Sequence, residues 1–277
     1  MTAPESSRRP RTRAQGPRLA RRAAAGAPGL LVLLLLLVLW ELGSRGGWLP
    51  IRFFPPVTAI LATFARVLAD GALPAHLGMT LLRMAAGGVL AGLVGVGLGL
   101  LMGYVQGLHR ALRPLVEFLR PMPPVAVLPA LILLLGIGER MKVAVIAFGC
   151  VWPILLNTVD GVRGVHPILL EVARNFRFSH GATLRKIVFP AALPQIMAGL
   201  RVSLAIAFIL ALVSEMVGAT SGLGFFIIFA QRSFRVGEMY AGMVLLAITG
   251  YALNAGFLWV EGRVLAWHRE SAGAVAV

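Results

Sequence analysis

The residue types that most often carry catalysis or bind metals are few and scattered in this sequence. The single cysteine, Cys150, lies in an apolar run, and no histidine stands at metal-ligand spacing from another: His76, His109, His166, His180 and His268. No P-loop and no GxSxG motif occurs. The sequence therefore predicts no catalytic site, no metal and no cofactor bound by this chain.

Charged side chains within apolar stretches are the next candidates. Glu215 lies near the end of such a stretch, where a carboxylate facing lipid costs about 2.5 kcal/mol or more. We expect it to face the bundle interior or the outer vestibule, where it either shapes a gate or bonds to a neighbouring helix end. Glu117 and Arg120 stand three residues apart and can meet on one helix face, as a structural pair or a substrate site.

Glycines and prolines mark two further candidate regions. Ser221, Gly222 and Gly224 predict a loop that turns back into the outer leaflet, with backbone amides that could contact an anionic substrate. The stretch 115–137 is interrupted by prolines, which remove backbone donors and disfavour a straight helix. It is either a wall of a transport pathway or a kinked structural helix. Its prolines are Pro121, Pro123, Pro124 and Pro129.

Composition indicates that membrane helices position these residues. Hydrophobic residues make up 58% of the 277, charged residues 13%, and the mean hydropathy is +0.84. A soluble domain of this length needs far more polar surface, so the apolar surplus is expected to face lipid. The net charge of +15 is concentrated partly in the first residues, but no aromatic residues are interleaved there, which disfavours nucleic-acid binding.

Six apolar stretches reach or approach the length of about 20 residues that a spanning helix needs. They are 27–42, 79–105, 115–137, 143–159, 193–217 and 240–260. The first follows an arginine-rich start but has no small-residue cleavage site after it, so we predict an uncleaved helix. The excess of Lys and Arg in the inner segments predicts both termini in the cytoplasm. A membrane domain over 27–264 would then lie between a basic, disordered cytoplasmic tail, 1–26, and a cytoplasmic tail, 265–277.

Glycines at four-residue spacing occur in the second stretch. Such spacing places them on one helix face, where a neighbouring helix can approach closely. They predict a packing seam, with a moving seam as the alternative. The glycines are Gly88 and Gly92, then Gly95, Gly99, Gly103 and Gly107.

The predicted cytoplasmic loop 160–192 is not a simple linker. Pro167 suits the first turn of a helix, and apolar residues recur at helical spacing through Arg177. Ser179 could cap a second helix that ends before Pro190. We expect two short amphipathic helices, which either bind a soluble partner or lie on the bilayer surface.

Several motifs here resemble those of ABC importer permeases. Glu171-Val172-Ala173 and the run from Ile187 to Pro194 are similar to the EAA motif of that family. Other stretches resemble its nitrate/sulfonate/taurine/bicarbonate branch, and the likeness covers roughly 53–264. These are Phe53-Phe54-Pro55-Pro56-Val57, Phe118-Leu119-Arg120-Pro121-Met122-Pro123-Pro124-Val125, Gly136-Ile137-Gly138 and Ser221-Gly222-Leu223-Gly224.

The resemblance implies a type I importer permease with six membrane helices, located in the bacterial inner membrane. It implies a cytoplasmic ABC ATPase dimer that binds the ATP, an external solute-binding protein, a second permease copy, and a small anionic solute such as an alkanesulfonate, taurine or nitrate. The 160–192 element would couple the chain to the ATPase, with Glu171 meeting it and Ala173 allowing close packing. The coupling residues it implies are Glu171, Val172, Ala173, Arg174, Phe176, Arg177, Gly181, Pro190 and Pro194.

One position departs from the family pattern. The motif usually has a glycine where this chain has Arg177, and glycine adopts positive φ at less cost than arginine. Either Gly181 moves the turn or Arg177 accepts the strain. An ion-coupled secondary transporter is the alternative function, although such proteins usually carry more ionisable groups near mid-membrane.

Overall fold

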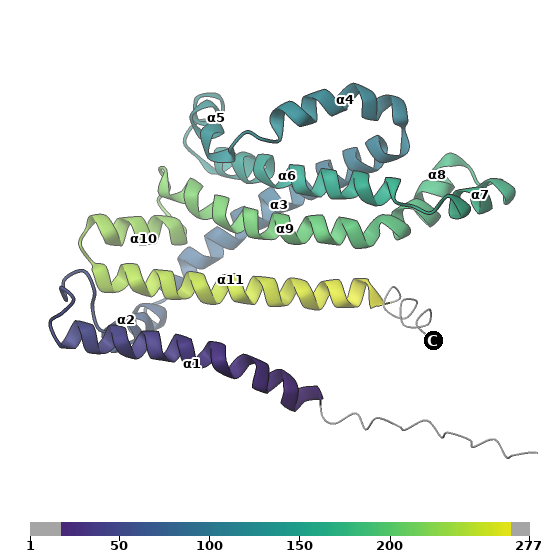
Figure 1. The fold of residues 1–277 in the computed structure, drawn as a ribbon. Helices are drawn as coiled ribbons and strands as arrows, with labels where there is room; N and C mark the ends of the chain where they lie inside the picture. The colour runs from purple at the N-terminus through teal and green to yellow at the C-terminus, as the bar shows by residue number, and fades with distance from the viewer. Residues whose placement is uncertain (1–17, 267–277) are drawn as a thin grey trace, which may run out of the picture. The chain divides into compact units, whose positions relative to one another are not determined.

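The computed structural model describes residues 18–266, and within that range every regular element is a helix (Figure 1). Contacts divide the chain after Ala59 into two units. The first contains α1 (Arg18–Arg45), and the second contains the bundle that follows. Most of the predicted tails, 1–26 and 265–277, lies outside the described residues.

Helix α1 begins at Arg18, inside the segment predicted to be disordered. Near its other end, Glu41 accepts hydrogen bonds from the Arg45 Nε, at 2.6 Å, and the Thr58 Oγ1, at 2.8 Å. The Ser44 hydroxyl donates to the carbonyl of Phe54 at 2.7 Å. These bonds fold the connection that follows α1 back onto the helix end.

In the second unit, four helices among the described residues are long and apolar enough to cross a membrane. They are α3 (Ala72–Tyr104), α6 (Glu139–Arg163), the continuous helix His180–Met216 that contains α9 (Phe189–Met216), and α11 (Val236–Val264). Two shorter apolar helices are α2 (Val57–Ala69) and α10 (Leu223–Arg232). These spans agree with the predicted all-helical membrane fold.

The stretch 115–137 was predicted as a span that its prolines bend or break, and the structure breaks it there. The chain forms α4 (Gln106–Leu119), the 3-10 turn η1 (Pro124–Val127) and α5 (Leu128–Leu135), and the two arms meet at 88°. The break falls at the cluster of prolines, which cannot donate to the preceding turn.

The seam between α3 and α6 explains part of the glycine spacing. An added Cβ on Gly99 would lie 2.6 Å from the Thr158 Cβ, and Gly95 and Gly103 are similarly close to α6. Any side chain at these positions would push the helices apart, so the glycines allow close backbone approach.

The glycine face of α3 that was predicted to pack against a neighbouring helix was partly wrong. Gly88 meets nothing within 4 Å, and Gly92 would meet only Leu200, at 3.9 Å. Gly87 takes their place against Ile146, in register with Gly95. Gly87 and Gly95 are two four-residue steps apart, so they belong to the same inclined ridge of side chains on α3, which packs against α6.

Candidate functional site

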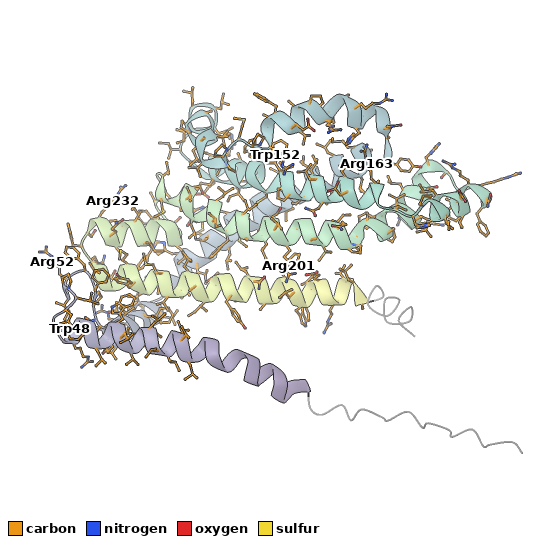
Figure 2. All side chains as sticks on the ribbon, in the orientation of Figure 1. Trp48, Arg52, Trp152, Arg163, Arg201 and Arg232 are labelled. Carbon is orange, nitrogen blue, oxygen red and sulfur yellow. The ribbon has the colours of Figure 1, made fainter. Side chains whose placement is uncertain are left out.

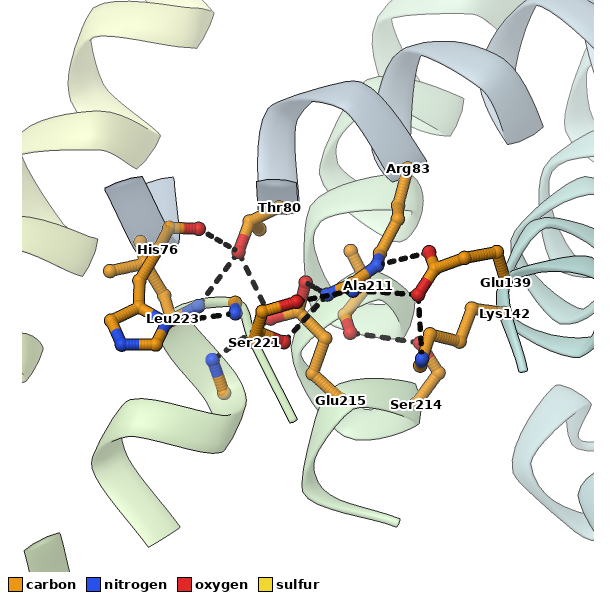
Figure 3. Close-up of polar contacts among 12 residues, drawn as sticks. His76, Thr80, Arg83, Glu139, Lys142, Ala211, Ser214, Glu215, Ser221 and Leu223 are labelled. Carbon is orange, nitrogen blue, oxygen red and sulfur yellow. Dashed lines mark hydrogen bonds and ion pairs between the residues drawn. The ribbon is translucent and has the colours of Figure 1, made fainter. Parts of the chain in front are cut away.

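A buried polar cluster lies where α3, α6 and α9 meet the start of α10 (Figure 3). We call this the α10 end of the bundle, and the opposite end, near Arg163, the α7 end. The Arg83 side chain is 2% exposed and that of Glu215 is not exposed at all. The Arg83 Nη1 donates to the Glu215 Oε1 at 2.8 Å. A buried charge is tolerated only when it is paired and hydrogen-bonded.

Each nitrogen of the Arg83 guanidinium donates within the cluster. Two bonds, of 2.6 and 2.8 Å, reach the Glu139 carboxylate from α6, and two more reach the carbonyl and the hydroxyl of Ser221, at 2.7 and 2.8 Å. Lys142 donates to the same Glu139 at 3.0 Å. The planar fork of arginine suits such multiple bonding. Arg83 therefore ties α3 to α6, to α9 and to the loop before α10.

The backbone amides of Gly222, Leu223 and Gly224 bind groups of the chain itself. The N–H of Gly224 donates to the Glu215 Oε2 at 2.9 Å, that of Leu223 to the Thr80 Oγ1 at 2.8 Å, and that of Gly222 to the His76 Nδ1 at 3.0 Å. The expectation that these amides contact an anionic substrate is therefore corrected, because an internal carboxylate already takes one of them. The loop leads into a short apolar helix, α10.

Gly222 is required by this geometry. Its φ is +109°, a conformation that other residues rarely adopt, and an added Cβ would collide with the Glu215 carboxylate. Of the two interpretations of Glu215, the hydrogen-bonded structural one matches its surroundings. The carboxylate accepts from Arg83, Thr80 and Gly224.

The sequence did contain a signal for this cluster, although no motif reveals it. Arg83 and Glu215 are opposite charges in two apolar stretches, and the alternating direction of successive spans places both at the same predicted depth. A charge at that depth needs a partner. Among the described residues, no group of His, Cys, Asp and Glu could hold a metal ion.

A second arrangement is the α7–α8 element, formed by α7 (Pro167–Asn175), α8 (His180–Thr183) and the π-helical turn η2 (Leu184–Val188). Pro167 opens α7, and the His166 ring accepts from the N–H of Ile168. The Ser179 hydroxyl accepts from the N–H of Ala182 and so caps α8, as predicted.

The turn after α7 is held by Arg177, at φ +51°, and not by Gly181, which lies inside α8. The N–H of Phe178 donates to the carbonyl of Ala173, and that of Arg177 to the carbonyl of Arg174, both at 2.9 Å. This is the Schellman arrangement, in which glycine usually occupies the left-handed position. Arg177 therefore accepts the backbone strain.

The two faces of α7 differ. Ala173 is 2% exposed and packs beneath the helix, whereas Glu171, Arg174 and Arg177 are exposed. Three apolar side chains four residues apart also face outward, and their exposed fractions are 58% for Ile168, 40% for Val172 and 71% for Phe176. We call these three the α7 stripe. No ion pair joins Glu171 to Arg174 among the contacts of the described chain.

The second predicted helix does not end before Pro190. Helix α8 continues through the π-helical turn into α9, so that one helix runs from His180 to Met216. Pro190 and Pro194 lie within it, half buried. Because Pro190 has no N–H, the wider π register accommodates the missing bond.

A third feature is a cavity of about 740 Å³ between α6, α9 and the break that follows α4. Pro124 lines it, and Pro121 and Pro123 belong to the same break. Its lining residues are Arg120, Met122, Pro124, Gly149, Trp152, Pro153, Leu156, Asn157, Asp160, Ile206, Ile209 and Leu210. Trp152, one of these residues, is labelled in Figure 2.

The predicted pair between Glu117 and Arg120 does not form. The Arg113 Nε donates instead to the Glu117 Oε1 at 2.7 Å, four residues along α4. Arg120 stands at the end of α4 and lines the cavity. The i, i+4 spacing suits ion pairs as well as i, i+3 does, and it leaves Arg120 to the cavity.

Comparison with known proteins completes the description. The profile of the family described as "Binding-protein-dependent transport system inner membrane component" matches residues 95–265. A Bacillus subtilis protein named as an aliphatic sulfonates transport permease, SsuC, is 32% identical over 88% of this chain and 89% of its own length. The taurine transport system permease TauC of Escherichia coli is 30% identical, covering 85% and 87%.

Solved structures show the same fold at lower identity. A chain of the MetNI methionine ABC transporter in an inward-facing conformation matches with a TM-score of 0.60 and 20% identity, covering 67% of this chain and 92% of that one. An amino acid ABC transporter matches with a TM-score of 0.57 and 16% identity, covering 72% and 94%.

Proposed function

Because the chain belongs to the family of binding-protein-dependent transport system inner membrane components, we propose that it is the permease of an ATP-driven importer. The solute would be a small anion such as an alkanesulfonate, taurine or nitrate, and ATP would be bound and hydrolysed by a partner subunit. The chain would lie in the bacterial inner membrane with both termini in the cytoplasm.

The α7 stripe is the observation that carries this proposal. Three large apolar side chains at one-turn spacing face outward from a helix that is capped at both ends. Exposed apolar surface of this kind, flanked by charges, is typical of a helix that docks into a groove of another protein. The occupant would be one subunit of an ABC ATPase dimer, with Glu171, Arg174 and Arg177 around the stripe.

The underside of the α7–α8 element supports a coupling role. The Tyr104 hydroxyl at the end of α3 lies 3.1 Å from the His180 Nδ1, and Val165, Val188 and Ala192 form a buried cluster between the element and the bundle. A displacement of α7 would therefore be transmitted to the bundle through these contacts. A second permease copy and an external solute-binding protein complete the proposed assembly.

The docking is tested by co-purification of the chain with its ATPase subunit. Val172→Glu and Glu171→Lys are each expected to abolish the complex, because they place a charge, or reverse one, within the proposed contact. The matched control is Val105→Glu, at a valine of similar exposure, 45%, between α3 and α4. Retention of the ATPase by both α7 variants would contradict the docking.

The solute is tested separately. Purified solute-binding protein is titrated with taurine, ethanesulfonate and nitrate, and uptake of the preferred solute into cells is then measured with and without this permease. We expect saturable binding of one of these anions and loss of its uptake without the permease. Uptake that persists when the ATPase is removed would favour the ion-coupled alternative.

A further inference from the structure

The cavity beside the α4–η1 break is lined by one cationic side chain. Arg120 follows α4 immediately, and its backbone N–H closes that helix on the carbonyl of Val116 at 2.9 Å. Arg120 is exposed toward the cavity, whose lining it joins, and its guanidinium makes no ion pair or hydrogen bond with any residue in 18–266. Because Glu117 pairs with Arg113, the charge of Arg120 is not neutralised locally.

The wall around Arg120 is mostly apolar. Met122, Trp152 and Leu156 contribute to it, together with three residues of α9. Asn157 is the one lining side chain with an amide, and its Nδ2 donates to the carbonyl of Pro153 at 2.8 Å. A cation in a hollow with low-dielectric walls attracts anions more strongly than the same cation on an open surface.

The acidic residue in this lining is Asp160. Gly149 and Asp160 both line it, and eleven residues of helix span about 16 Å. An added Cβ on Gly149 would lie 3.1 Å from the ring of Pro124, so the segment that carries Arg120 joins the wall at the Gly149 end. Asp160 stands near the last turn of α6, at the α7 end. Arg120 and Asp160 form no ion pair among the described residues.

We propose that Arg120 forms an anion subsite in this cavity, which takes the oxyanion group of a small solute such as a sulfonate or nitrate. The inference rests on the proposed import function for the arrival of the solute. The guanidinium offers several donors in a plane that matches an oxyanion. The break at Pro121 and Pro123 holds this donor group at the cavity, since the chain cannot continue as a helix there.

Trp152 provides a local probe of the subsite, because it lines the same cavity. In a chain whose other tryptophans (Trp40, Trp48, Trp259 and Trp267) are replaced by phenylalanine, its fluorescence is quenched with iodide, an anion, and with acrylamide, which is neutral. The experiment uses the full chain in phosphatidylcholine nanodiscs at constant ionic strength, after a check of its elution profile and helical circular dichroism.

Arg120→Gln is expected to lower the iodide quenching constant about twofold, as for the loss of a nearby unit charge that is partly screened by salt, and to leave acrylamide quenching unchanged. Arg120→Lys should restore most of the iodide effect. Arg113→Gln, on α4, is the matched control, and it should change neither constant. If Arg120→Gln leaves the iodide constant at the value of the unsubstituted chain, the proposal is overturned.

A lipid headgroup could supply the same oxyanion. If phosphatidylglycerol in the nanodisc abolishes the iodide effect while sodium ethanesulfonate does not compete with iodide, Arg120 binds lipid and the solute subsite is wrong. Competition by ethanesulfonate or nitrate supports it. Since quenching needs no transport, a failure of uptake in the wild-type importer would count against the proposed function alone.

Discussion

Glu215→Gln is the sharpest test of the polar cluster at the α10 end. The substitution keeps the shape of the side chain but removes its charge and half of its accepting capacity. Glu215 accepts from Arg83, Thr80 and Gly224 and is fully buried. Glutamine can accept through one oxygen only, and its NH₂ group must then face a donor.

The cost can be worked from these bonds. Loss of a hydrogen bond to a charged group costs about 1.5–3 kcal/mol, and loss of a neutral one about 1 kcal/mol. Removing one partner of a buried ion pair costs about 3–5 kcal/mol in all. Because Arg83 keeps its two bonds to Glu139, we take the lower end, about 3 kcal/mol, which is roughly a 150-fold change in the folded-to-unfolded ratio.

The assay is reversible unfolding by sodium dodecyl sulfate in bicelles, followed by circular dichroism. Glu117→Gln is the control, since it breaks an exposed pair with Arg113 and should cost less than about 0.5 kcal/mol. In a double-mutant cycle with Arg83→Gln, the losses should be non-additive by about 2 kcal/mol. A Glu215→Gln protein as stable as the wild type, with reduced solute uptake, would refute the structural role and favour a gate.

Three further substitutions test the backbone geometry through the same unfolding measurement. Arg177→Gly should stabilise the chain by about 1 kcal/mol, because glycine adopts the positive φ of that turn without strain, whereas Arg177→Ala should give no gain. Gly99→Leu should destabilise it by about 2–3 kcal/mol by forcing the α3–α6 seam apart, while Gly97→Ala, which meets nothing within 4 Å, should be neutral or slightly stabilising. Gly222→Ala should cost about 3 kcal/mol, since it combines an unfavourable φ with a collision against Glu215; a loss below about 1 kcal/mol would contradict the role given to that glycine.

The fold was largely predictable because the length of an apolar stretch is a local property. The all-helical membrane fold and the family are confirmed, and Ser179 and Pro167 occupy the cap and first-turn positions that their chemistry favours. The coupling and pathway roles of individual residues stay predictions. For the turn after α7, the sequence left open whether Gly181 or Arg177 holds the strained position. The structure places the positive φ at Arg177.

The polar cluster was missed because its contacts are distant in sequence. Arg83 and Glu215 are 132 residues apart, and neither belongs to a motif. The error at Pro190 has a different cause. Proline ordinarily ends a helix. Here the backbone N–H that Pro190 lacks is accommodated by one π-helical turn, Leu184–Val188, and the helix continues.

The α7–α8 element and the polar cluster around Glu215 lie at opposite ends of one helix. The continuous segment from His180 to Met216 has 37 residues, or about 55 Å, with the α7–α8 element at one end and Glu215 at the other. A tilt of about 5° would move its far end by about 5 Å over that length. Arg83 bonds α9 to α3 and, through Glu139, to α6, and the glycine seam packs α3 closely on α6. Sliding α9 within the subunit would break these contacts at a cost of several kcal/mol, whereas moving the three helices together would break none. In the proposed importer, force applied at α7 should therefore rotate α3, α6 and α9 as one body.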